Sequence, residues 1–472
     1  MKHSFFERFF SLAESKKLLA LAGPVYIAQL SQVGMNFVDT AMAGQASAED
    51  MAAVALASSI WTPVALFGVG CLLSLSPLIA QLVGARDYAK TSHVLRQGIV
   101  LSGLLSVVLM CFFYVISFQL QSFGLAPHLA ALGGGYLRAV MWSLPAFFLF
   151  VSVRSLFEGY SRTRPAMVIS IVGLLLNIPC NYVLIYGKFG LPALGAVGCG
   201  VATSFVYWVM ALAMVFYARR DPSFADLGAL FSPLWRRSAH TKRVDWSTIG
   251  QIMRIGLPSA MAMLFEVSLF AVTALLLARL GTVVIAGHQI AMNFSSVLFM
   301  SSLALGVTST IRVSTCLGAG KVSGAHLAAW TALGAGVSCA CFNALLVVCF
   351  REQIALIYNS DPEVVALAAH LLLFAAAFQV VDAVQAWGIG VLRGYNDTAT
   401  ISVVCLVCYW CIGLPLGYTL TYGYLTGTPW GAAGFWMAYI TSLCVASCCY
   451  IWRINHLHRL DSQAVRIKLG LR

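Results

Sequence analysis

Long apolar runs, each about long enough to cross a lipid bilayer, recur along the whole sequence. A membrane-spanning helix needs about 20 predominantly apolar residues. Twelve such runs, separated by short polar segments, lie near residues 18–44, 52–83, 97–119, 136–158, 165–187, 194–218, 255–278, 283–316, 326–350, 365–392, 399–422 and 429–452. Because transmembrane β-strands leave only short alternating patterns, these continuous runs predict an all-α membrane protein with twelve transmembrane helices.

The composition supports a membrane protein. Hydrophobic residues make up 60% of the 472 residues and charged residues only 10%, whereas a typical soluble domain is about 25% charged. The chain has too few charged side chains to cover a soluble surface, which excludes soluble globular, disordered and collagen-like classes. Residues 1–17 are charged and amphipathic, so we expect no cleavable signal peptide before the first span.

The distribution of basic residues predicts the orientation. The chain has 29 Lys and Arg against 17 Asp and Glu, and most of the basic residues lie in short segments beside apolar runs. If the N-terminus is cytoplasmic, only Arg138, Lys188, Arg279 and Arg351 lie toward the outside. The positive-inside rule therefore places both termini in the cytoplasm and makes nucleic acid an unlikely reason for the charge.

The two halves of the chain resemble each other. Pro24 and Pro258 stand 234 residues apart near the start of the first and seventh spans. Further matches keep nearly the same offset, and they include Gly84 with Gly318, Gly159-Tyr160 with Gly394-Tyr395, Pro179 with Pro415, and Tyr186-Gly187 with Tyr422-Gly423. Their order along the chain indicates a duplication of a six-span unit.

The duplication predicts the domain organisation. Residues 1–218 form an N-lobe, 219–250 a cytoplasmic linker, 251–452 a C-lobe and 453–472 a basic cytoplasmic tail. Because six is even, both halves enter the membrane in the same sense, as in parallel-repeat transporters. We therefore expect two six-helix lobes with a central cleft that opens alternately to the two sides.

Sequence motifs for other chemistry are missing. Gly318-Ala319-Gly320-Lys321 lacks the spacing and the following Ser or Thr of a P-loop, and no HExxH or GxSxG motif is present. The 14 cysteines lie mostly inside apolar runs, where cysteine behaves as a small hydrophobic residue. We therefore expect neither an enzyme nor a cysteine metal site, and no cofactor.

Three acidic residues lie inside predicted spans. Asp39 is near the outer end of the first span, Glu266 lies about eleven residues into the seventh, and Asp382 lies about ten residues before the inner end of the tenth. At 1.5 Å per residue, Glu266 and Asp382 share a depth of roughly 15 Å from the cytoplasmic face. Acids at such depths usually mark ion or proton pathways. The alternative, a structural acid satisfied by a neighbour, is favoured for Glu158, which ends a span beside two arginines.

Polar and aromatic residues near these acids suggest ligands. Asn177 and Asn181 share one helical face on either side of Pro179, and their amide oxygens suit a hard monovalent cation. Bridging between helices is the alternative interpretation. The rings of Phe265, Phe294 and Phe378 could hold a bulky organic cation by cation–π contact or could simply be packing.

Several segments together resemble one transporter family. The chain is similar to multidrug and toxic compound extrusion (MATE) transporters of the NorM branch over about residues 15–450. The segments that carry the resemblance are Phe37-Val38-Asp39-Thr40-Ala41-Met42-Ala43-Gly44, Pro165-Ala166-Met167, Leu175-Leu176-Asn177-Ile178-Pro179, Leu264-Phe265-Glu266-Val267, Asn293-Phe294-Ser295-Ser296, Asp382-Ala383-Val384-Gln385 and Leu392-Arg393-Gly394-Tyr395.

The resemblance implies an antiporter in a bacterial inner membrane that exports cationic amphipathic drugs and dyes against Na⁺ or H⁺ and contributes to antibiotic resistance. We expect a monomer. Carried over by position, Asp39, Asn177, Asn181 and Thr203 form an N-lobe cation site, and Glu266 and Asp382 form a C-lobe site for cation or substrate. Na⁺ is a possible ligand at either site. The sequence departs from some members at Phe378, where they carry Tyr, so that a ring remains and a hydroxyl is lost.

Three alternatives stay open. Related folds move lipid-linked sugars, although such flippases need basic residues for phosphate and the deep charges here are acidic. A membrane-embedded enzyme and a structural scaffold are the alternatives from other classes. The expected partners are small organic cations and membrane lipid.

Overall fold

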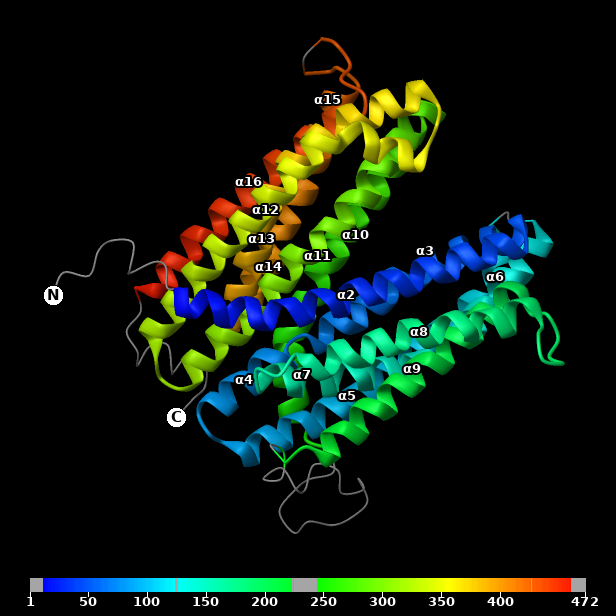
Figure 1. Cartoon of the computed structure of the whole chain (residues 1–472). Helices are drawn as coiled ribbons and strands as arrows, with labels where there is room; N and C mark the ends of the chain where they lie inside the picture. The colour runs from blue at the N-terminus through cyan, green and yellow to red at the C-terminus, as the bar shows by residue number, and fades with distance from the viewer. Residues whose placement is uncertain (1–11, 124–125, 223, 225–243, 426, 460–472) are drawn as a thin grey trace. The chain divides into compact units, whose positions relative to one another are not determined.

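The chain is helical throughout its described part. The computed structural model describes residues 12–123, 126–222, 224, 244–425 and 427–459, and these residues contain no strand. In the first half of the chain the elements are α2 (Leu12–Ala46), α3 (Ala48–Leu72), α4 (Leu75–Gly84), α5 (Tyr88–Gln119), η1 (Leu120–Phe123), α6 (Pro127–Val140), α7 (Ser143–Gly159), α8 (Arg164–Tyr186) and α9 (Gly195–Arg220). In the second half they are α10 (Trp246–Ala278), α11 (Thr282–Gly318), α12 (Val322–Tyr358), α13 (Pro362–Gly394), α14 (Thr398–Cys405), η3 (Leu406–Gly413), α15 (Leu414–Thr421) and α16 (Ala432–His458) (Figure 1).

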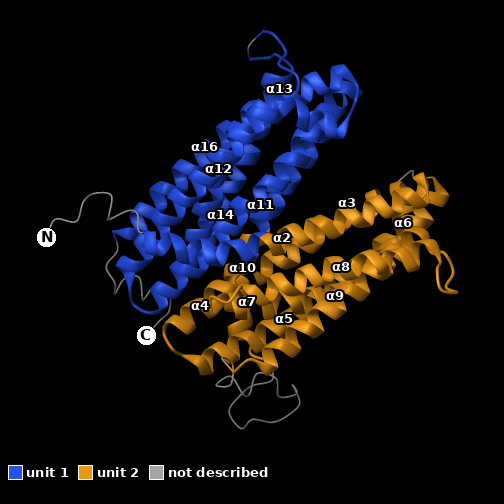
Figure 2. Ribbon diagram, in the orientation of Figure 1, with its two compact units in different colours: residues 1–26, 261–472 blue, residues 27–260 orange. Residues whose placement is uncertain are grey.

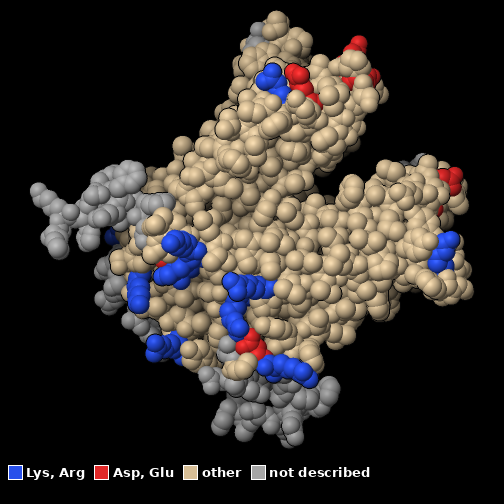
Figure 3. Space-filling view, in the orientation of Figure 1, with Lys and Arg blue, Asp and Glu red and all other residues tan. Residues whose placement is uncertain are grey.

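The predicted number of spans is confirmed. Eleven segments of the described chain are long and apolar enough to cross a membrane, and the bent pair α6 and α7 makes a twelfth when counted as one span. In each unit coloured in Figure 2, the charged side chains visible on the face drawn in Figure 3 lie near the ends and leave a broad uncharged band. That band is the surface expected of a protein whose middle faces lipid.

Two spans of the first half are interrupted, which the apolar pattern does not predict. The second span breaks between α3 and α4 at Leu73 and Ser74, and the fourth bends by 42° between α6 and α7. A proline follows each break, Pro77 four residues after Leu73 and Pro145 four residues after Met141, and it has no N–H to donate to the carbonyl oxygen of that residue. At the first break the buried Ser74 hydroxyl donates hydrogen bonds to the carbonyl oxygens of Cys71 and Ile252, at 3.3 and 3.0 Å, so a polar contact accompanies the break.

The duplication predicted from sequence recurs as a repeated contact. The hydroxyl of Tyr186 donates to the carbonyl oxygen of Met42 at 2.9 Å. The hydroxyl of Tyr422, its counterpart in the second half, donates to the carbonyl oxygen of Leu276 at 3.1 Å. In each half, the fifth span is therefore joined to the first by the same tyrosine-to-backbone bond.

The chain forms two compact units that do not coincide with its two halves. Unit 1 contains residues 1–26 and 261–472, and unit 2 contains residues 27–260 (Figure 2). The boundaries fall inside α2 and α10, each two residues after a proline, Pro24 and Pro258. The predicted N-lobe, 1–218, instead contains all of α2, and the predicted C-lobe, 251–452, contains most of α10. Most of the linker's arginines and lysines and most of the basic tail lie outside the described residues, as do residues 1–11.

The first part of α2 belongs to the core of unit 1. Leu18 is fully buried in the hydrophobic core that α10 to α16 build. Four residues earlier, Glu14 forms an ion pair with Arg312 of α11, with Oε1 2.6 Å from Nη2 and 2.7 Å from Nε. A buried side chain and an ion pair therefore fix this segment to helices of the second half.

The first part of α10 belongs to unit 2 in the same way. Ile252 is fully buried in the core of that unit. Just before the helix, the Asp245 carboxylate accepts a hydrogen bond from the Thr248 hydroxyl at 2.7 Å and lies 3.0 Å from Nε2 of His93 on α5. Hydrogen bonds from Thr248 and His93 lower the pKa of Asp245 to about 2. This carboxylate is therefore charged at neutral pH and anchors the start of α10.

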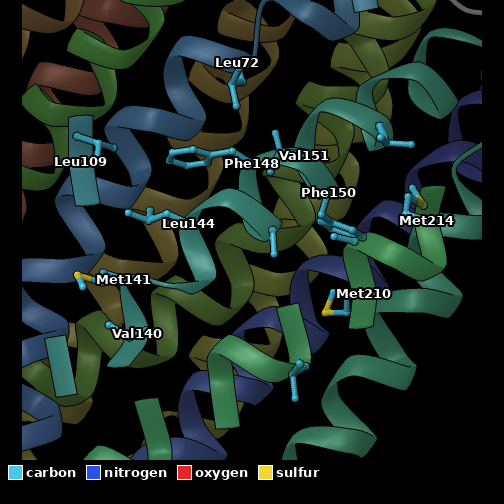
Figure 4. Packing of buried hydrophobic residues seen from close by; sticks show 14 of the residues in the cluster. Leu72, Leu109, Val140, Met141, Leu144, Phe148, Phe150, Val151, Met210 and Met214 are labelled. Atoms are coloured by element: carbon cyan, nitrogen blue, oxygen red, sulfur yellow. The ribbon is translucent and has the colours of Figure 1, made fainter. Parts of the chain in front are cut away.

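Close side-chain packing fills the interior of each unit. In unit 2 several side chains of α7, among them Phe148 and Phe150, are fully buried in the hydrophobic core (Figure 4). In unit 1 two glycines, Gly306 on α11 and Gly390 on α13, let the backbones touch, since a Cβ on Gly390 would collide with the carbonyl oxygen of Gly306. Small residues at such crossings are typical of membrane helices, and this crossing fixes the helix that carries Asp382.

Candidate functional site

The four residues predicted for the N-lobe site meet around one carboxylate. Asp39 on α2 is only 4% exposed. Its Oδ1 accepts hydrogen bonds from Nδ2 of Asn177 at 3.0 Å and of Asn181 at 2.6 Å, both on α8. Its Oδ2 accepts one from the hydroxyl of Thr203 on α9 at 2.9 Å. Three helices of unit 2 therefore converge on Asp39.

All of these contacts are donors to Asp39, which suits the charged carboxylate. Asn181 also donates to Oδ1 of Asn177 at 3.1 Å, while its own Oδ1 is buried without a hydrogen-bond partner among the described residues. Side-chain oxygens of the two asparagines, Thr203 and Asp39 are thus close enough together to serve as ligands. Asn177 and Asn181 share a helical face, as their spacing predicts, and α8 continues through Pro179 without interruption.

The two acids predicted for the C-lobe site lie in unit 1. Glu266 on α10 is partly buried, and Asp382 on α13 is 2% exposed. The two carboxyl groups interact electrostatically. In the described part of the chain, Oδ2 of Asp382 has no hydrogen-bond partner and neither acid forms a salt bridge. Two acids without a basic partner form an arrangement that favours a proton or a cation between them.

The three phenylalanines differ in their surroundings. Phe378 is 7% exposed and packs edge-on against Trp436, with ring centroids 5.8 Å apart. Phe265 and Phe294 are partly buried at the edge of the same core. Phe378 therefore has a clear packing role, and contact of the three rings with an organic cation stays a prediction.

The remaining acid of interest has a partner other than the arginines that follow it. Glu158 at the end of α7 pairs with Arg154 one turn earlier, with Oε1 3.2 Å from Nε. Arg162 instead pairs with Asp221. An internal salt bridge of this kind agrees with the structural interpretation of Glu158.

Two polar residues beside the C-lobe acids were missed by the sequence analysis. The side-chain amide of Gln385 on α13 donates to the hydroxyl oxygen of Tyr409 in η3. Gln385 follows Asp382 by three residues and so shares its helical face, a signal that spacing alone could have given. Tyr409 lies in an uninterrupted apolar run and gave no such signal. Within the described residues, no group of three or more His, Cys, Asp or Glu side chains could hold a metal ion.

Comparison with known proteins agrees with this architecture. The family model MatE matches the chain twice, over residues 24–183 and 258–419, in the same register as the duplication. The eukaryotic MATE transporter AtDTX14 matches with a TM-score of 0.85 at 22% identity, covering 97% of this chain and 98% of that one. A multidrug resistance MATE family transporter in an outward-facing conformation matches with a TM-score of 0.83 at 17% identity over 99% of both chains. VcmN from Vibrio cholerae, in its bent form, matches with a TM-score of 0.81 at 16% identity over 97% and 98%.

The fold is thus that of a two-lobe, multi-span membrane transporter. With two family matches that together cover more than half of its length, the chain belongs to the MatE family. Members of this family are secondary transporters that bind small molecules and couple their movement to an ion, and they are not enzymes. The expectation of a MATE transporter is confirmed.

Proposed function

We propose that the protein is a Na⁺- or H⁺-coupled antiporter that exports cationic amphipathic drugs and dyes across a bacterial inner membrane by alternating access, and so contributes to antibiotic resistance. The observation that carries the proposal is the pair of acidic sites, with buried Asp39 in unit 2 and partly buried Glu266 beside buried Asp382 in unit 1. Charges in low dielectric are costly unless compensated. Acids without a salt bridge among the described residues are therefore binding sites for cations rather than structural ion pairs.

Antiport follows if the coupling ion and the exported cation compete for these acids. Each lowers the affinity for the other, and this coupling is reciprocal. Ion binding on one side then releases the organic cation, and ion release on the other side lets the next one bind. The acidic character of the sites argues against a flippase for phosphate-bearing lipids, because Arg154, a largely buried base, is already paired with Glu158.

Reconstituted vesicles test the proposal directly. Purified full-length protein should move a fluorescent cationic dye when an inward-directed gradient of Na⁺ or of H⁺ is imposed, and one of the two gradients should suffice. Dye that stays put under both gradients, in vesicles shown to contain folded protein, would refute the proposed function. Separate Na⁺ and pH gradients identify the coupling ion in the same experiment.

The orientation is also proposed, with both termini in the cytoplasm. In a cysteine-free variant, single thiols restored within residues 45–50 and 188–193 should react with an impermeant reagent added to intact cells. A thiol within 220–245 should react only after permeabilisation. Labelling of the long linker from outside would reverse the orientation.

A further inference from the structure

The eleventh span contains a π-helical segment, η3, between α14 and α15. A π-helical turn inserts residues into an α-helix and rotates the side chains that follow. Such turns are rare in proteins, and those that occur are often found at functional sites. Here the segment extends over Leu406–Gly413 and consists mostly of apolar residues. Its two central residues, Tyr409 and Trp410, form hydrogen bonds to other helices.

These two residues contact both helices that carry the C-lobe acids. Tyr409 is 1% exposed, and its hydroxyl oxygen accepts a hydrogen bond from the amide of Gln385, which is 2% exposed on α13. The indole Nε1 of Trp410 donates to the carbonyl oxygen of Phe265 on α10 at 3.3 Å. Phe265 directly precedes Glu266, and Gln385 lies one turn after Asp382. The π-helical segment therefore joins α10 and α13 at the level of the acid pair.

The phenol of Tyr409 lies close enough to both acids, Glu266 and Asp382, to interact with them electrostatically. The other titratable groups near it are Cys405 on its own span and Tyr450 on α16. Because the phenol oxygen accepts from the Gln385 amide, its single proton can be donated to another acceptor, and the Cys405 thiol is a second hydrogen-bond partner of the same phenol. Within the described residues, Oδ2 of Asp382 is a buried acceptor without a partner.

We propose that Tyr409 completes the C-lobe ion site: its hydroxyl, held by Gln385, donates to the acid pair and sets the affinity of that pair for the coupling ion. The inference rests on the proposed function, because it assumes that Glu266 and Asp382 bind the coupling ion. Tyr409 acts on the ion through the carboxylates and is a positioning residue. Removal of the hydroxyl changes the affinity for the ion but leaves the ring and the apolar packing in place.

Competition between ion and dye measures this effect. Full-length protein in detergent binds a fluorescent cationic dye, and Na⁺ or H⁺ is titrated to displace it. In Tyr409→Phe, displacement by the coupling ion should have its midpoint shifted about tenfold, the effect expected from a hydrogen bond to a charged group. The dye affinity without competing ion should stay within about twofold, because the ring is kept. Gln385→Met, which keeps the phenol but releases its orientation, should shift the same midpoint by a smaller factor of about three.

A matched control separates this effect from the loss of any buried hydroxyl. Tyr395 at the inner end of α13 is 1% exposed, and its hydroxyl has no hydrogen-bond partner among the described residues. Tyr395→Phe should leave the midpoint unchanged. An unshifted midpoint in both Tyr409→Phe and Gln385→Met would overturn the proposal, as would an equal shift in Tyr395→Phe.

The acids themselves distinguish this failure from failure of the proposed function. If Glu266→Gln and Asp382→Asn abolish ion competition while the Tyr409 and Gln385 variants do not change it, only the role of Tyr409 is wrong. If ion competition survives neutralisation of both acids, the C-lobe site itself is wrong. Melting temperatures of all variants confirm that folded protein is compared.

Discussion

Asp39→Asn is expected to abolish gradient-driven export of cationic dyes while the protein still reaches the membrane. The substitution removes the charge and one of the two oxygens. The remaining oxygen can still accept from Asn177 and Asn181, and the new amide can donate to the Thr203 hydroxyl, so the protein should fold while the cation loses a charged ligand. Neither the charge nor the ligand geometry for a coupling cation survives this change.

Dye uptake into inverted vesicles under a Na⁺ or pH gradient measures the result. Glu49→Gln is the matched control, because its side chain is 69% exposed, and it should transport like wild type. Thr203→Val keeps the shape of the side chain and removes one donor, so it should weaken coupling by about tenfold without abolishing it. Normal export by Asp39→Asn would show that this aspartate does not couple ion flow to transport.

Neutralising either C-lobe acid should also cripple export and flatten its ion dependence. Glu266 and Asp382 interact with each other and form no salt bridge among the described residues. In the proposed mechanism, the coupling ion and the organic cation compete for the charge of these two acids. Glu266→Gln and Asp382→Asn each leave one carboxylate, and the remaining site no longer needs a proton or cation to offset like charges.

The variants of Glu266 and Asp382 should differ in how much activity they keep. Glu266→Asp keeps the charge one methylene shorter and should retain part of the activity, whereas the double neutral variant should bind dye with no dependence on pH or Na⁺. Glu363→Gln, at the exposed start of the helix that carries Asp382, is the control and should behave as wild type. Ion-dependent dye release from the double neutral variant would contradict the proposal, and unchanged export by both single variants would make the acids structural.

The N-lobe cluster could be predicted from the residues in part, because some of its information is local. Asn177 and Asn181 are one helical turn apart, so their spacing alone places them on one face. Asp39 is an acid in an apolar run. The prediction that Asn177, Asn181 and Thr203 join Asp39 in one site came from the family resemblance, because no local pattern pairs residues that far apart in the sequence. Thr203 gave no signal of its own, since threonine is common in membrane helices.

The C-lobe site could be predicted only in part. Charge and depth identified Glu266 and Asp382, since acids inside apolar runs are rare. The position of Tyr409 beside these acids could not be predicted. The residues around it are apolar on every side of the helix, and the π-helical turn changes the direction in which each side chain points. The breaks at Leu73-Ser74 and at Met141-Trp142 were missed because the apolar runs continue through them, although Pro77 and Pro145, each four residues after the start of a break, were a signal for them.

The duplication also explains why each lobe has a different site. At the offset of 234 residues, Asp39 corresponds to Thr273, and Glu266 corresponds to Gln32. Asn181 corresponds, at an offset of 236, to Gly417, against which the ring of Phe435 packs closely. In unit 1 apolar packing thus occupies the counterpart of the N-lobe site, and in unit 2 an amide occupies the counterpart of Glu266.

The assignment of the beginnings of α2 and α10 to opposite units has a consequence for the origin of the chain. Leu18 and Ile252 are both buried in a core built mainly by the other half. A single six-helix half would expose this part of its first helix and leave an unfilled groove for the same part of another copy. Two identical six-helix chains would bury both surfaces if they exchanged these segments, which is a common route to symmetric dimers. Joining two such chains end to end would turn this exchange between molecules into an internal one.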